Sequence, residues 1–244
     1  MDREAKPRWG IWVDVEGFGK LWSGDNLALR GLRHLTSMVY AVGTKCYPNP
    51  PQRLFAHQIG DAFYIASDFH EASLDRCAAI ATVLMRGMTA AGCVARASIA
   101  EGDLGDYAGC RPPEVTAAIE QEDGKAFARL GAGIMTLQEN MGQGLIDAVA
   151  LDKGADTKGA LLLVAARARG RLSPGFVTRP LDRRADILAI DWVHSQSDLI
   201  DEVAACAGHG SEDPATLRDR LAAYAKWHEP PKEWCEQTSR FAGM

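Results

Sequence analysis

The chain has 244 residues, of which 47% are hydrophobic and 24% charged, a composition that suits one globular domain with a sizeable core. Its formal net charge of −5 provides no broad basic face, so neither nucleic acid nor an anionic membrane is an expected partner. The longest apolar stretch, residues 159–166, is far shorter than the ~20 residues that span a bilayer. The charged start of the chain lacks the apolar core of a signal peptide, and we expect a cytoplasmic protein.

The cysteines and histidines indicate neither a disulfide framework nor a structural metal. The six cysteines form no C-x-x-C pair, and the six histidines lack zinc-ligand spacing. The cysteines are Cys46, Cys77, Cys93, Cys110, Cys206 and Cys235. We expect reduced, packed thiols, as in most cytosolic chains of this size.

The first predicted elements are a strand and a helix. Residues 10–15 are rich in aromatic and branched side chains and predict a short buried strand. A glycine turn follows. Apolar side chains then recur at spacings of three and four over residues 28–42, which predicts an amphipathic helix with Ser23 or Asp25 as its N-cap.

A proline-rich break leads into a predicted hairpin, a second helix and a last strand. Residues 53–57 and 62–66 are predicted as strands joined by a tight turn at residues 59–61. Residues 74–88 carry one apolar stripe and predict a helix, and residues 93–100 predict a strand. The order is therefore β-α-β-β-α-β, which is the α+β arrangement called ferredoxin-like.

This topology places two carboxylates together. A right-handed crossover makes the first two strands parallel and leaves room for the third strand between them, antiparallel to the first. Asp14, at the end of the first strand, then lies beside Asp61, at the start of the third, with neighbouring strands ~4.8 Å apart. The core spans about residues 9–153, and residues 154–244 are expected to add further strands and helices around it in a single domain.

Two neighbouring carboxylates repel each other unless a cation lies between them. Carboxylate oxygens are preferred ligands of Mg²⁺ and Mn²⁺, which take their other ligands from water and substrate phosphates. The Gly-Phe-Gly turn at residues 17–19 offers backbone N–H groups to a phosphate chain. The pattern therefore predicts a metal and phosphate site at this end of the sheet.

These motifs resemble the class III nucleotide cyclases. Residues 14–18 match that family's first metal motif, D-x-x-G-F, and residues 59–65 match its second, I-G-D followed by an apolar strand. Residues 95–103 resemble its R-x-G-I-x-x-G strand, with Ser98 in place of the first glycine. The resemblance covers roughly residues 9–153.

The resemblance implies roles for particular residues. Asp14 and Asp61 would be the catalytic aspartates and bind two ions, Mn²⁺ or Mg²⁺, with the Val15 carbonyl assisting. Gly17 and Phe18 would belong to the loop that contacts the triphosphate. Arg96 matches a position that contacts phosphate, although an arginine on a strand beside a helix is often a surface ion pair.

The chain departs from the family where ribose and base are recognised. Residues 141–152 resemble the helix V-N-x-A-x-R-x-E, but Ile146 replaces its asparagine and Ala150 its arginine. His57 stands at a base-selecting position that is usually Lys or Glu, and a histidine satisfied within a strand is the alternative. Glu139 and Asn140 fall near the second base-selecting position.

This combination is similar to the bacterial pyrimidine cyclases of anti-phage signalling, which are small standalone cyclase domains. The similarity implies cyclisation of UTP, or of CTP, to a 3′,5′-cyclic monophosphate that activates a separate effector in antiviral defence. It also implies a homodimer with shared active sites.

Three other interpretations stay open. A cyclase-like domain that no longer catalyses would serve as a nucleotide-binding or dimerisation module, and Ile146 and Ala150 favour it. A purine cyclase is a second. A diguanylate cyclase shares the fold but requires G-G-[DE]-E-F at the hairpin, which this chain lacks. Glu16 is expected to be a solvated loop carboxylate, or to lie just outside the metal ligands.

Overall fold

The computed structural model describes residues 8–22, 27–49, 52–106, 111–120, 127–130, 132–136, 140–154, 157–210 and 212–244. The strands are β1 (Arg8–Val15), β2 (Leu54–Ile59), β3 (Ala62–Ser67), β4 (Ala95–Gly102), β5 (Gly105–Asp106), β6 (Phe127–Leu130), β7 (Gly133–Thr136), β8 (Asn140–Met141), β9 (Leu162–Ala165), β10 (Thr178–Leu181) and β11 (Arg184–Ile190). The helices are α1 (Phe18–Trp22), α2 (Leu27–Ala41), α3 (Asp75–Ala90), α4 (Pro113–Glu120), α5 (Gln143–Asp152), α6 (Asp198–Ala207), α7 (Pro214–His228) and α8 (Lys232–Ala242), with a short π-helix η1 (Val42–Cys46) and a short 3-10 helix η3 (Ala166–Arg171).

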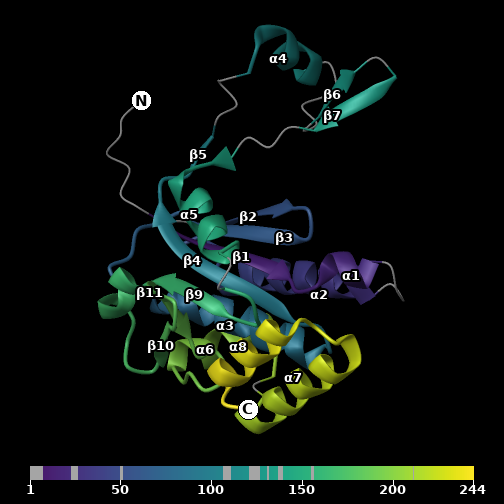
Figure 1. Cartoon of the computed structure of the whole chain (residues 1–244). Coiled ribbons are helices and arrows are strands. Elements are labelled where there is room, and N and C mark those ends of the chain that lie inside the picture. The colour runs from purple at the N-terminus through teal and green to yellow at the C-terminus, as the bar shows by residue number, and fades with distance from the viewer. Residues whose placement is uncertain are drawn as a thin grey trace.

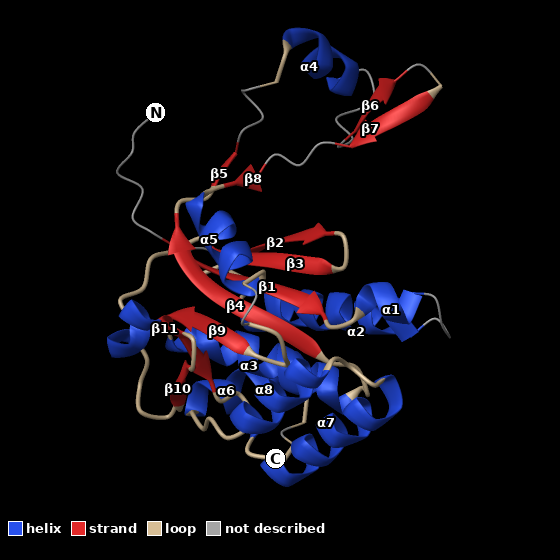
Figure 2. Cartoon of the chain, viewed as in Figure 1, coloured by secondary structure: helices blue, strands red, loops and turns tan. Residues whose placement is uncertain are grey.

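A seven-stranded sheet in the order β10-β11-β9-β4-β1-β3-β2 forms the centre of the molecule (Figures 1 and 2). Within it, β1, α2, β2, β3, α3 and β4 make the ferredoxin-like β-α-β-β-α-β unit, with β1 antiparallel to both β3 and β4. The predicted α+β fold class is confirmed. The predicted strand and helix ends differ from the observed ones by one or two residues.

The two faces of the sheet are covered differently. Alternate side chains of β1, such as Ile11 and Val13, are buried with Leu35 of α2 and Leu84 of α3 on one face. On the opposite face a smaller apolar cluster joins strand residues to α5, and it contains Trp12, Ala62, Tyr64, Ala66, Leu145 and Ala148. In Figure 1, α5 crosses β4, and the β3 side chains in this cluster are buried as well.

Residues after α5 extend the same sheet. β9 adds to β4 in parallel, and β11 and β10 follow in antiparallel pairing. The helices α6, α7 and α8 then pack around the α3 side of the molecule (Figure 1). Asp213 caps α7 by accepting hydrogen bonds from the amides of Ala215 and Thr216, at 2.9 and 3.0 Å, with Pro214 in the first turn.

A long excursion leaves the body between β4 and α5. It carries α4 and the β6–β7 hairpin and stands away from the sheet in Figure 1. At its base β5 pairs with β8, Gly105 opposite Met141. There the backbones of Gly102 and Gly144 approach so closely that a Cβ on Gly102 would lie 2.2 Å from the Gly144 nitrogen, so only glycine fits.

The cysteines and the lengths of the helices can also be compared with the predictions. The five described cysteines are free thiols, with Cys77 and Cys93 buried and Cys206 exposed; Cys110, Ser23 and Asp25 lie outside the described residues. Among the described helices, none combines the length and apolar character needed to cross a membrane.

Candidate functional site

The two predicted metal ligands meet at one end of the sheet. Asp14 pairs across the β1–β3 ladder with Ala62, and Asp61 precedes Ala62 in the β2–β3 turn. Asp61 is close enough to raise the pKa of Asp14 by repulsion. The structure therefore brings Asp14 and Asp61 together, in the arrangement that the topology predicts.

Asp14 lies in an environment that disfavours its ionised form. Burial, followed by repulsion from Asp61 and Asp152, raises its pKa from an ordinary 3.8 to about 7, while Arg96 acts in the opposite direction. Its Oδ1 atom is buried and accepts no hydrogen bond from the residues that the structure describes. A buried acceptor oxygen without a donor is costly, and a cation would relieve that cost.

Glu16 and Asp152 add two more carboxylates to this cluster, and Glu16 is not the solvated residue that we expect from the sequence. Its side chain is only 17% exposed, and burial raises its pKa, with the Arg96 guanidinium opposing the shift. Burial also raises the pKa of Asp152, which is 5% exposed. Asp14, Glu16 and Asp152 thus lie near one guanidinium, and Asp61 lies near Asp14, so carboxylates outnumber cations in this cluster.

Arg96 sits on the same face as Asp14, directly opposite it across the β1–β4 ladder. Its Nε donates to Asp152 Oδ1 at 2.6 Å, its Nη2 donates to the Asp152 carbonyl, and its Nη1 lies 4.0 Å from Glu16 Oε2. The guanidinium is therefore held by protein groups in this structure. Asp152 was not predicted to be a site residue, although it is the last residue of the predicted helix at residues 141–152.

The loop between β1 and α1 has the conformation that its glycine requires. Gly17 has a φ of +71°, and a Cβ there would lie 3.2 Å from the Tyr224 hydroxyl. The amides of Lys20 and Leu21 both donate to the Gly17 carbonyl at 3.0 Å, which starts the short helix α1 at Phe18. This helix is not predicted, because five residues carry too little periodicity.

His57 lies on the sheet face that carries Asp14. It pairs with Tyr64 across β2 and β3, and Tyr64 in turn pairs with Trp12 of β1. Burial lowers the pKa of His57, so the imidazole is neutral at neutral pH. On the other side of β1, Trp12 pairs with Ser98 of β4. The Ser98 hydroxyl donates to the Ala148 carbonyl of α5 at 2.6 Å. Ser98 thus fixes α5 on the sheet.

The two departures from the family helix lie on the outer side of α5. Ile146 is 52% exposed, and Ala150 is also exposed. Neither contributes to the apolar cluster beneath the helix. Glu139, and the side chain of Asn140, lie outside what the structure describes.

The donor set suits a hard divalent cation that takes further ligands from water and phosphate. No three His, Cys, Asp or Glu side chains in the described ranges are arranged to hold one metal ion among themselves. Asp14 and Asp61 instead offer two carboxylates, and Mg²⁺ characteristically binds one or two protein carboxylates together with substrate phosphates. The buried, unbonded Oδ1 of Asp14 and the surplus of negative charge fit such an ion.

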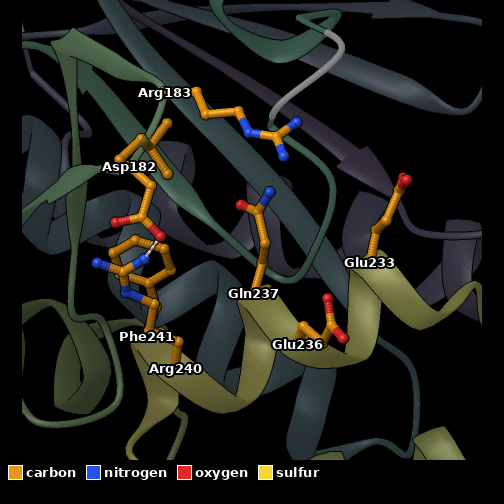
Figure 3. A pocket seen from close by; sticks show the side chains of 8 residues that line it. Asp182, Arg183, Glu233, Glu236, Gln237, Arg240 and Phe241 are labelled. Carbon is orange, nitrogen blue, oxygen red and sulfur yellow. Dashed lines mark ion pairs between the residues drawn. The ribbon is translucent and has the colours of Figure 1, made fainter.

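A separate cavity of about 380 Å³ lies between α8 and the β10–β11 turn (Figure 3). An ion pair between Asp182 and Arg240 crosses its wall, and Glu233, Glu236 and Gln237 of α8 line it. None of the predicted site residues lines this cavity. The lining carries both acidic and basic side chains, so its charge does not indicate one kind of ligand.

No protein-family model matches the chain, and comparison with curated proteins also gives no match. Among solved structures, the chain is similar to a bacterial light-regulated adenylyl cyclase, at 9% sequence identity and a TM-score of 0.45, covering 86% of this chain and 57% of that one. It is similar to the dimeric guanylyl cyclase domain of the RhoGC fusion protein from the aquatic fungus Blastocladiella emersonii, at 10% identity and a TM-score of 0.44, covering 76% and 93%. A third is the catalytic core of a rhodopsin-guanylyl cyclase with converted specificity in complex with ATPαS, at 11% identity and a TM-score of 0.44, covering 76% and 94%.

The chain thus spans little more than half the length of the first of these structures. None of the three TM-scores reaches 0.5. The function proposed below therefore rests on the residues of this chain and on the motifs that they form.

Proposed function

We propose that this protein is a nucleotidyl cyclase that converts a pyrimidine nucleoside triphosphate, UTP before CTP, to its 3′,5′-cyclic monophosphate and pyrophosphate. The supporting observation is the buried, donor-free Oδ1 of Asp14 beside Asp61, at the end of a strand that continues into a Gly-Phe-Gly loop. The motifs at residues 14–18 and 59–65 resemble the metal motifs of class III cyclases.

Asp14 and Asp61 would hold two Mg²⁺ or Mn²⁺ ions, with the Val15 carbonyl assisting. Such ions favour ionisation of the ribose 3′-hydroxyl and neutralise charge on the α-phosphate and the leaving group. The loop at Gly17 and Phe18 would orient the triphosphate chain through its backbone amides. Arg96 would contact phosphate only after exchanging part of its bonding to Asp152.

The pyrimidine assignment rests on the base-selecting position. His57 replaces the usual Lys or Glu, and its neutral imidazole offers one hydrogen-bond donor and one acceptor. The N3–H and O4 groups of uracil also form a donor and acceptor pair. By resemblance to the anti-phage pyrimidine cyclases, the cyclic product would activate a separate effector as a second messenger.

We propose a homodimer with two shared sites as the active unit. The side of α5 that does not join the apolar cluster on the sheet carries the exposed Ile146 and Ala150. A two-fold axis would bring this helix face of one protomer to the aspartates of its partner, completing both sites.

A catalytically inactive nucleotide-binding or dimerisation module is the second candidate. Arg96 is occupied by Asp152, and α5 places no polar side chain at residues 146 and 150. An inactive module would bind a triphosphate and release no cyclic product.

The deciding experiment incubates the full chain with each of ATP, GTP, CTP and UTP and with Mn²⁺, and identifies products by mass spectrometry. We expect cyclic UMP, lost in Asp14→Ala and in Asp61→Ala and kept in Asp219→Ala, which removes an exposed carboxylate. A higher kcat/KM for a purine triphosphate would contradict the pyrimidine assignment. If none of the four nucleotides gives a cyclic product, the inactive nucleotide-binding or dimerisation module becomes the better interpretation.

The shared site is tested by mixing variants. Asp14→Ala protein combined with an Ile146→Arg variant should regain activity through heterodimers, because one of their two composite sites is intact. Proven subunit exchange without regained activity would exclude the shared site.

A further inference from the structure

The β1–α1 loop is held from the far end of the chain. The Tyr224 hydroxyl of α7 donates to the Glu16 carbonyl at 3.1 Å, across 208 residues of sequence. The Glu16 amide donates to the Val94 carbonyl at 2.9 Å, so both backbone polar groups of Glu16 are hydrogen-bonded. The backbone of Glu16, the first residue after β1, is therefore held in one position.

A second contact holds α1, the short helix that follows this loop. Lys20 Nζ donates to the carbonyls of His228 and Glu229, at 2.6 and 3.2 Å, where α7 ends. Glu229 has a φ of +45°, an uncommon conformation for a residue with a side chain. The loop is thus joined to α7 at Glu16, and α1 directly after it is joined to the α7–α8 junction at Lys20.

Tyr224 is itself rigidly packed. Its side chain is buried, its ring centroid lies 4.5 Å from that of His228 and 5.7 Å from that of Trp234, and Trp234 is also buried. Its hydroxyl also lies where a Cβ on Gly17 would be 3.2 Å away. A rigid hydroxyl over a left-handed glycine restricts how the Gly-Phe-Gly backbone turns.

We infer that Tyr224 is a positioning residue for the loop that binds the metal–triphosphate complex, and that α7 and α8 act on the site through it. This inference rests on the proposed function for what the loop binds. The loop's N–H groups can orient phosphates only if their directions are fixed before binding, because ordering them on binding costs affinity. Tyr224, and the carbonyls of His228 and Glu229 that hold Lys20, supply that order from elements outside the β-α-β-β-α-β unit.

The test compares Tyr224→Phe with Tyr40→Phe. The first removes only the hydroxyl over the loop and keeps the ring contacts, and the second removes a hydroxyl from an exposed ring on α2. Hydrogen exchange of the Lys20 and Leu21 amides, which bond to the Gly17 carbonyl, should become about fivefold faster in Tyr224→Phe, since one such hydrogen bond is worth about that factor. Amides of β9 should keep their rates.

The second readout is the Kd of 3′-deoxy-UTP with Mn²⁺, a triphosphate that has no 3′-hydroxyl and cannot cyclise. We expect about a fivefold weaker Kd in Tyr224→Phe and no change in Tyr40→Phe. Lys20→Met should show the same two effects, whereas Lys226→Met, at an exposed site on α7, should show neither.

Unchanged amide exchange at residues 20 and 21 in both Tyr224→Phe and Lys20→Met would overturn the inference. So would faster exchange with an unchanged Kd, because that result would describe a merely structural contact. If the wild-type chain does not bind the pyrimidine analogue, the proposed substrate fails. The inference then stands or falls on the exchange rates and on the Kd of Mn²⁺ alone.

Discussion

Replacing Asp14 by asparagine should stabilise the metal-free protein, and more strongly at higher pH. In the folded state burial raises the pKa of this carboxyl to about 7 from an ordinary 3.8, so protonation favours folding. The contribution of Asp14 to the free energy of unfolding therefore falls as the pH rises from about 4 to about 7. Asparagine has nearly the same shape and cannot ionise.

The two pKa values set the size of the effect. Integrating the proton linkage between 3.8 and about 7 gives a gain for Asp14→Asn of about 2 kcal/mol at pH 5 and about 4 kcal/mol at pH 8. Urea unfolding in EDTA at both pH values measures it. Asp219→Asn, which removes one exposed carboxylate, is the matched control and should show no such gain.

Adding Mn²⁺ should reverse the order of stability. The ion binds the folded wild type and adds RT ln(1 + [Mn²⁺]/Kd) to its stability, and the asparagine variant should gain much less. A gain in EDTA that does not grow between pH 5 and pH 8 would refute the reasoning about Asp14. Equal stabilisation of both proteins by Mn²⁺ would refute its role as a ligand.

Three other substitutions test the surroundings of the site by urea unfolding. Gly17→Ala should cost about 1–2 kcal/mol because of the positive φ and the Tyr224 hydroxyl, whereas Gly19→Ala, whose Cβ would enter open space, should cost less than about 1 kcal/mol. Arg96→Met should cost about 3–5 kcal/mol by leaving Asp152 without its buried partner, whereas Arg184→Met, which breaks an exposed pair with Asp186, should change stability far less. Ser98→Ala should cost about 1–3 kcal/mol, since the buried Ala148 carbonyl loses its 2.6 Å donor; a loss no larger than that of an exposed Ser→Ala change would contradict this.

The core of the fold and the aspartate pair could be predicted because short-range patterns determine them. Apolar periodicity marked β1, α2 and α3, and the handedness of crossovers then placed Asp14 beside Asp61. Neither step needs to know which side chains meet across the molecule.

The contacts around the aspartates could not be predicted, because they join distant parts of the chain. Arg96 bonds a residue 56 positions later, and that pairing depends on how α5 docks on β4. Glu16 is buried because the helices near the C-terminus cover it, with Tyr224 bonded to its carbonyl. The local sequence around Glu16, two glycines and a charged lysine, indicates only an exposed loop.

The glycine contact at the base of the excursion has a mechanical consequence. The chain leaves β4 and re-enters at α5 through a single point, where Gly102 meets Gly144 and β5 pairs with β8. In the part of the chain that the structure describes, these contacts connect the excursion to the body, and they lie at the start of α5. A force on the excursion would therefore be carried first by α5, which bears Ile146 and Ala150 on its outer side and is held to β4 through Ser98 and Arg96.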